Sequence, residues 1–180
     1  MMEQPLTAWE NFYVIVGSSA GALTGLQFVV IALIREADTA ASMLEIRAFG
    51  TPTVVHFCAA LLMSAILSAP WHSLFSAGLT LSACGAAGII YLIRVIRHAR
   101  RSRYDPDAED WFWYAGLPLV AYLALLAAGL LLPRHSTLSL FVVAATALLL
   151  LFVGIHNSWD SVTYIAVGRR QEGKEDKNQS

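Results

Sequence analysis

The stretch Ala48–Ile93, AFGTPTVVHFCAALLMSAILSAPWHSLFSAGLTLSACGAAGIIYLI, contains no Asp, Glu, Lys or Arg. A helix needs about 20 apolar residues to cross the hydrocarbon core of a bilayer, so a charge-free stretch of this length predicts two membrane-spanning helices. The turn between them is expected at Pro70–Ser73, where a proline and polar side chains interrupt the apolar sequence. The stretch therefore indicates a chain that crosses a membrane more than once.

Three further charge-free stretches occur in the chain, and each has the length of one span: Asn11–Ile34, Trp111–Pro133 and His135–Trp159. Because 57% of the residues are hydrophobic and only 14% are charged, we predict an all-α, polytopic integral membrane bundle of five transmembrane helices. The expected spans are about 11–34, 50–69, 74–93, 112–132 and 137–157. Pro118 is expected to kink the fourth span. Trp111, Trp113 and Tyr114 are expected at the membrane interface.

The last helix is expected to continue beyond the lipid to residue 168, so that residues 1–168 form one transmembrane domain. Residues 169–180 are polar and mixed in charge, and this composition predicts a disordered cytoplasmic tail. The start of the chain lacks the basic region of a secretory signal, so we interpret the first helix as retained.

The basic residues predict the orientation, because positively charged loops lie on the cytoplasmic side of a membrane. With the N-terminus outside and the C-terminus in the cytoplasm, eleven of the twelve basic residues lie on the inner side and only Arg134 lies outside. The eleven are Arg35, Arg47, Arg94, Arg97, Arg100, Arg101, Arg103, Arg169, Arg170, Lys174 and Lys177. We expect the membrane to be a bacterial-type cytoplasmic membrane.

The first predicted helix carries Gly17, Gly21 and Gly25 at intervals of four residues, with small side chains between them. Small residues let helix backbones approach closely in lipid, where no hydrophobic force acts between helices. We therefore expect this face to meet another helix. The sequence leaves open whether that helix belongs to the same chain or to another copy in a homo-oligomer, or whether the face lines a pore.

A second group of polar residues gathers at the predicted inner end of the last helix. His156 and Asp160 are four residues apart, so their side chains can form a hydrogen bond along one helix face. Counting about 1.5 Å per residue places Gln27 and His56 at a similar depth. Polar groups at that depth are costly without partners and so mark candidate functional sites. The predicted inner-leaflet ligand or proton site comprises Gln27, His56, His156, Asn157, Asp160 and Tyr164.

The alternative for Asp160 is a hydrated residue at the interface, next to Trp159. A run of arginines follows the third span and is expected to contact anionic lipid at the cytoplasmic face: Arg94, Arg97, Arg100, Arg101 and Arg103. A platform for a soluble partner is the alternative for this run. The net charge of −1 argues against a nucleic-acid partner. Cys58 and Cys84 are expected to pack as small apolar residues rather than to form a disulfide or a metal site.

The sequence lacks phosphate-binding, zinc-protease, Gly-x-Ser-x-Gly and dinucleotide motifs, and it has no long polar segment for a catalytic domain. We therefore expect no enzymatic activity, no metal and no cofactor. The favoured function is a homo-oligomeric channel or a small-solute or ion permease, because five helices are too few to enclose an aqueous path alone. The alternatives are a membrane-embedded scaffold or regulatory subunit of a larger complex and, less favoured, a redox or haem protein ligated by His56 and His156.

Overall fold

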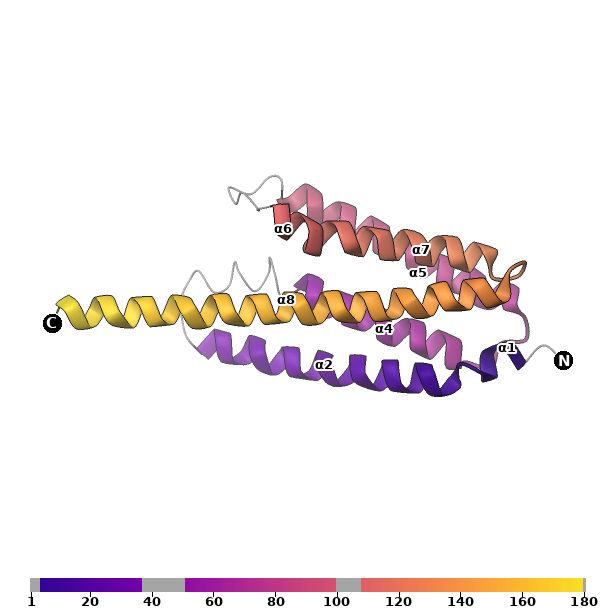
Figure 1. Ribbon diagram of the computed structural model, residues 1–180, viewed down its shortest axis with the longest axis horizontal. Helices are drawn as coiled ribbons and strands as arrows, with labels where there is room; N and C mark the ends of the chain where they lie inside the picture. Colours follow the sequence, from indigo (N-terminus) through magenta and orange to yellow (C-terminus); the bar gives the residue numbers. More distant parts are fainter. Residues whose placement is uncertain (1–3, 37–50, 100–107, 180) are drawn as a thin grey trace.

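The five expected spans are helices in the computed structural model, which describes residues 4–36, 51–99 and 108–179 (Figure 1). Side chains are described for residues 6–32, 51–97, 109 and 111–163. The helices that are long and apolar enough to cross a membrane are Glu10–Ala32, Thr51–Ser68, Leu74–Arg97, Phe112–Leu131 and Ser136–Thr163. The prediction of an all-α chain with five such helices is thus confirmed for the described residues.

The first helices of the chain are α1 (Gln4–Thr7), α2 (Glu10–Glu36), α4 (Thr51–Ser68) and α5 (Leu74–Ala99). Then come α6 (Ala108–Trp111), the π-helix η2 (Phe112–Gly116), α7 (Leu117–Leu131) and α8 (Ser136–Gln179). Two helix starts have a clear local cause. Pro52 lies in the first turn of α4, where its missing N–H costs little. The Ser73 hydroxyl caps α5 by accepting the backbone N–H of Ser76 at 3.2 Å.

The central helix of the bundle is α8. It packs against both α4 and α7, while α2 packs on α4 and α5 packs on α7. In Figure 1, α8 runs through the middle, with α2 on one side and α5 and α7 on the other. The link from α4 to α5 and the link from α7 to α8 lie at one end, which we call the Trp71 end (Figure 1). The opposite end, with η2 and the start of α4, is the Trp113 end; the predicted orientation places it at the cytoplasmic face.

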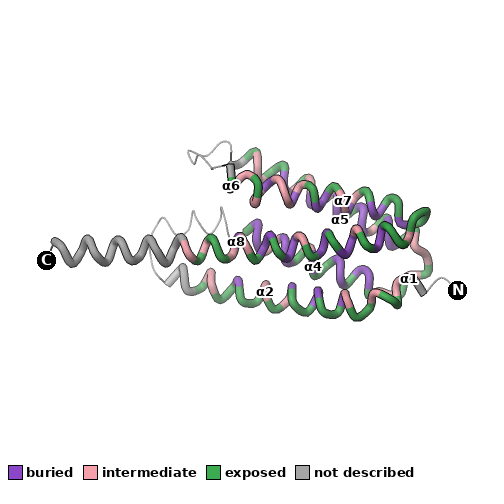
Figure 2. Tube along the Cα trace, viewed as in Figure 1, coloured by how far each residue is buried: buried purple, intermediate pink, exposed green. Residues whose placement is uncertain are grey.

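The buried face of α8 follows the helical period. Leu140, Val143, Ala147 and Leu150 are each at most 1% exposed. The outward faces carry large apolar side chains that stay exposed. Figure 2 shows buried and exposed residues alternating along the long helices. Phe28 on α2 is 59% exposed, and large apolar side chains on the other long helices are exposed to a similar extent. Lipid is the surrounding that suits so much exposed apolar surface.

The backbone of α8 is helical as far as Gln179, and its C-terminal part projects beyond the other helices (Figure 1). Arg, Gln, Glu and Lys are common in this part of the helix, and all four have good helix propensity.

A π-turn occurs where we expected a proline kink. The backbone N–H of Leu117 donates to the carbonyl of Phe112, five residues earlier. Pro118 then lies in the first turn of α7, where no helical hydrogen bond requires the backbone N–H that proline lacks. Such π-turns often occur at functional sites.

Candidate functional site

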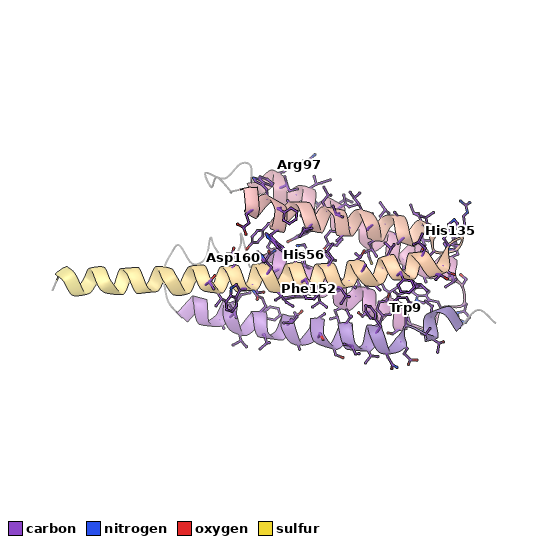
Figure 3. The ribbon with its side chains drawn as sticks, viewed as in Figure 1. Trp9, His56, Arg97, His135, Phe152 and Asp160 are labelled. Carbon is purple, nitrogen blue, oxygen red and sulfur yellow. The ribbon has the colours of Figure 1, made fainter. Side chains whose placement is uncertain are left out.

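His56 of α4 has no exposed surface. Its Nδ1 lies 3.0 Å from the Tyr122 hydroxyl, so a buried hydrogen bond joins α4 to α7. Figure 3 shows His56 in the interior of the bundle. Its other ring nitrogen, Nε2, is buried and has no hydrogen-bond partner among the described residues. His56 therefore has one hydrogen-bonding position in use and one open.

Asn157 of α8 is also without exposed surface. Neither its Oδ1 nor its Nδ2 has a hydrogen-bond partner within the described part of the chain. A buried polar atom without a partner costs about 1–3 kcal/mol of stability. Native structures keep few such groups, and those they keep require an explanation.

Contacts on either side of Asn157 fix the direction of its side chain. Gly154 lies against the ring of Phe57 on α4, and His156 stacks on Trp113 of η2. At about 100° per residue, Asn157 lies between these two neighbours, about 60° from Gly154 and about 100° from His156. Asn157 therefore faces the seam between α4 and η2–α7, which the hydrogen bond from His56 to Tyr122 also crosses.

The contact of Gly154 with Phe57 also sets the levels along the bundle. The two helices run in opposite directions, so Asn157 and His56 both lie beyond this contact toward the Trp113 end. Their backbone levels differ by roughly two residues, or about 3 Å along the helix axis. We call His56, Tyr122 and Asn157 the seam cluster.

The stack of Trp113 on His156 borders the seam cluster. The ring centroids are 3.7 Å apart and the planes are nearly parallel, at 9°. His156 is half-buried, and its Nδ1 has no hydrogen-bond partner in the described chain. The ring of Trp113 therefore packs η2 against α8.

Gln27 of α2 lies on the other side of Asn157. The Ser158 hydroxyl donates to Gln27 Oε1 at 3.0 Å and also lies 2.8 Å from the Gly154 carbonyl. Three helices thus bring Gln27, His56 and Asn157 to the Trp113 end. Gln27 nevertheless belongs to the contact between α2 and α8, because Ser158 is about 100° away from Asn157 on α8.

The expected pair of His156 and Asp160 is not formed. No hydrogen bond joins these two described residues, and Asp160 is exposed. His156 stacks on Trp113 instead, so its ring does not turn toward Asp160. This geometry fits the alternative of a hydrated Asp160 next to Trp159, which is 71% exposed. The side chain of Tyr164 lies outside the described residues.

The three glycines of α2 have different surroundings. A Cβ at Gly17 would lie 3.0 Å from the Cβ of Ser64, so this glycine allows α2 and α4 to approach closely. At Gly21 and Gly25 a Cβ would meet no described atom within 4 Å. Positions four residues apart rotate by about 40° around a helix, so the glycine face turns away from α4. Among the described residues, therefore, only the first of the three glycines packs closely within the chain.

The predicted lipid-contact arginines are described only in part. Arg94 and Arg97 are exposed on α5, as headgroup contact requires. Arg100, Arg101 and Arg103 lie outside the described residues. Cys58 is exposed and Cys84 is half-buried, and both are free thiols. Among the described side chains, no three of His, Cys, Asp and Glu are grouped so that they could hold a metal ion.

Sequence reasoning missed Tyr122 and the partner of Trp113. Tyr122 lies in the middle of a predicted span, where a phenol needs a hydrogen-bond partner, and this signal could have identified it. The face-to-face contact of Trp113 with His156 left no such signal, because the two residues belong to different spans.

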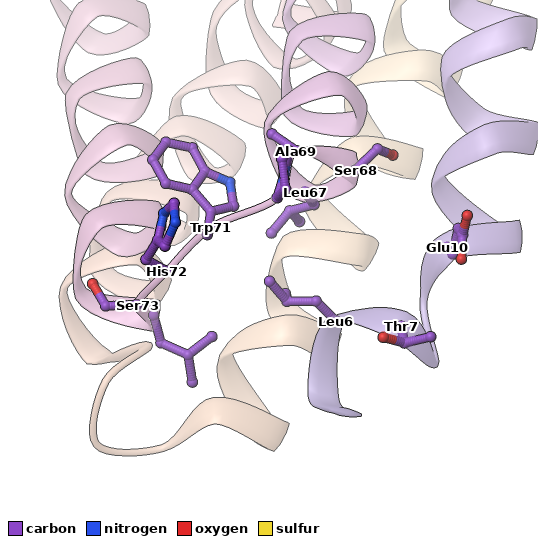
Figure 4. Close-up of a pocket in the computed structure, with 11 residues that line it drawn as sticks. Leu6, Thr7, Glu10, Leu67, Ser68, Ala69, Trp71, His72 and Ser73 are labelled. Atoms are coloured by element: carbon purple, nitrogen blue, oxygen red, sulfur yellow. The ribbon is translucent and has the colours of Figure 1, made fainter. Parts of the chain in front are cut away.

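A separate hollow of about 200 Å³ opens at the Trp71 end (Figure 4). The segment from Leu6 to Glu10 forms one wall and the link from α4 to α5 forms the other. Glu10 and His72, its titratable side chains, are both exposed. No sequence pattern pointed to this hollow.

No family model, no curated protein and no solved structure matches the chain. The fold and the site therefore define a class: an all-α bundle with five helices that have the length and hydropathy of a multi-pass membrane protein. Within the described part of that bundle, the seam cluster contains three buried side-chain atoms without a hydrogen-bond partner: His56 Nε2, Asn157 Oδ1 and Asn157 Nδ2.

Proposed function

We propose that the chain is a homo-oligomeric channel or permease that carries a small solute past the seam cluster. The observation that supports this most is the state of His56 and Asn157. Both side chains have no exposed surface, and together they present three hydrogen-bonding atoms without partners among the described residues. Polar groups held inside a spanning segment at such a cost are typical of substrate and ion pathways.

Further polar residues of α8 continue from the seam cluster toward the Trp71 end. Ser139, Thr146 and Asn157 lie within about 20° of one line along the helix, because they are separated by nearly whole numbers of turns. They are 3%, 3% and 0% exposed. The side of α8 that faces the seam is therefore polar at three levels, which supports a path along this helix.

The uncovered glycines of α2 support assembly. Gly21 and Gly25 meet no described atom within 4 Å, and Ala22 beside them is exposed. Small residues give little contact with lipid but allow a second helix to approach closely. A second copy of this chain is the partner we propose for this face, because one five-helix bundle is too small to enclose a comfortable aqueous path.

The first test measures the mass of the purified protein in nanodiscs. We expect an oligomer for the wild type and a smaller species for Gly21→Leu, because a branched side chain would separate helices that meet at this position. Leucine at Val29, which is 55% exposed on the same helix, is the matched control and should leave the mass unchanged. A wild-type monomer without a partner would count against a channel.

A membrane-embedded scaffold or regulatory subunit remains the second candidate, because the same uncovered face of α2 can receive a different protein. It predicts a mixed complex in place of a homo-oligomer. A His-ligated redox or haem protein has less support. The Tyr122 hydroxyl occupies Nδ1 of His56, and the ring of His156 lies flat on Trp113. A Soret band in the purified protein would revive that candidate.

A further inference from the structure

We infer that the seam cluster accepts a small neutral solute that both donates and accepts hydrogen bonds, such as urea or water, and rejects ions. The inference rests on the proposed function and names the class of solute.

Charge is the first reason. Every Asp, Glu and Arg side chain that the structure describes is exposed: Glu10, Arg94, Arg97, Glu109, Arg134 and Asp160. An ion at the seam cluster would therefore find no counter-charge among the described side chains. Burying an unpaired charge in a low-dielectric interior costs far more than burying a neutral group that forms hydrogen bonds. The cluster thus discriminates against ions by their desolvation.

The open hydrogen-bonding positions are the second reason. The Asn157 amide offers a donor at Nδ2 and an acceptor at Oδ1. His56 can supply either function. When the Tyr122 hydroxyl donates to Nδ1, the Nε2 of the neutral ring carries the proton and donates. When Nδ1 carries the proton and donates to Tyr122, Nε2 accepts. The cluster therefore complements a solute with donors and acceptors in either tautomer.

Burial is the third reason, and it limits size. The three open atoms have almost no accessible surface, so a solute reaches them only after neighbouring side chains move. The movement needed is least for a small solute. Trp113 is the neighbouring side chain best placed to move, because it belongs to the short π-turn η2 and its ring stacks on the residue next to Asn157.

The test compares solutes with the full-length protein in liposomes. Stopped-flow light scattering reports water efflux and urea entry, while fluorescent indicators report potassium and chloride. We expect faster water or urea movement than in protein-free liposomes, with no increase for either ion. Ion flux without urea or water flux would overturn the inference and leave a permease standing. Unchanged flux of all four would overturn the inference and the proposed function together.

Substitutions then assign the flux to the cluster. Asn157→Leu keeps the size of the side chain but removes both hydrogen-bonding atoms, so urea flux should fall by about tenfold or more, the factor that one or two hydrogen bonds are worth. Thr80→Val, on α5 and away from the seam, is the matched control. If Asn157→Leu does not fold, His56→Phe provides the same test from α4. Wild-type urea flux in whichever of these variants folds would show that the path lies elsewhere.

Discussion

Two sets of glycines in this molecule have the same chemistry and opposite surroundings. On α2, Gly21 and Gly25 recur every four residues and meet no described atom within 4 Å. Between α5 and α7, the glycines are spaced less regularly, yet a Cβ at Gly85 would lie 2.6 Å from the backbone nitrogen of Leu126 and one at Gly129 would lie 2.7 Å from the Gly78 carbonyl. Regular spacing along one helix thus does not identify where two helices approach each other closely among the described residues.

The difference has a physical reason. Close approach requires that two helices present small residues to each other at the same level. A pattern within one helix shows the small residues of that helix but not those of its neighbour. On α5 and α7 both helices present small residues at the same level, and the Ser82 hydroxyl of α5 also donates across the pair to the Leu126 carbonyl of α7 at 3.4 Å. On α2, Gly21 and Gly25 meet no such counterpart within the described chain.

The largest effect is expected for Gly129→Ala. The new methyl group would meet Ser82 Oγ and the Gly78 carbonyl oxygen, so the backbones of α5 and α7 must move apart. Overpacking of this kind typically costs about 1–3 kcal/mol, and backbone contacts lie at the upper end. Thermal unfolding in detergent, followed by size-exclusion chromatography, measures the loss. A midpoint equal to that of the wild type would show that the two helices are not in close contact.

A smaller effect is expected for Gly88→Ala. Gly88 lies where α5 and α7 contact each other, next to Tyr122 of the seam cluster. Its methyl group would overlap the ring of Tyr122, whose hydroxyl bonds to His56. The ring must shift, so the variant should lose stability together with the hydrogen bond, which is worth about 1 kcal/mol. In a Tyr122→Leu background the same substitution should cost less stability, because the effects of substitutions at two residues in contact are not additive. Equal costs in both backgrounds would contradict the contact.

The smallest effect is expected for Gly25→Ala. This position meets nothing in the described chain, and alanine favours a helix over glycine by about 0.5–1 kcal/mol. Thermal unfolding of the protein under monomeric conditions should therefore show no loss or a slight gain. A clear loss under those conditions would place an in-chain neighbour against Gly25 and remove the contrast between the two glycine sets.

The candidate site could be predicted from the sequence to a limited depth. Rise per residue was enough to bring Gln27, His56 and Asn157 to one end, because depth in a straight helix is a simple count. The pairing of His156 with Asp160 failed because a spacing of four residues permits a contact without favouring it over another partner. The ring of His156 instead stacks on Trp113, which belongs to a different helical segment.

The number, length and approximate ends of the five long apolar helices that the structure describes were determined by the sequence alone, because the absence of charge over a membrane-sized stretch is a property of consecutive residues. Which faces meet was decided only by the tertiary structure. The rotation of α8, set by Phe57, Gln27 and Trp113 on three different elements, directs Asn157 toward His56 and Tyr122. Helices in lipid associate through complementary shape and hydrogen bonds. Both depend on two helices at once, so a pattern along one helix cannot specify them.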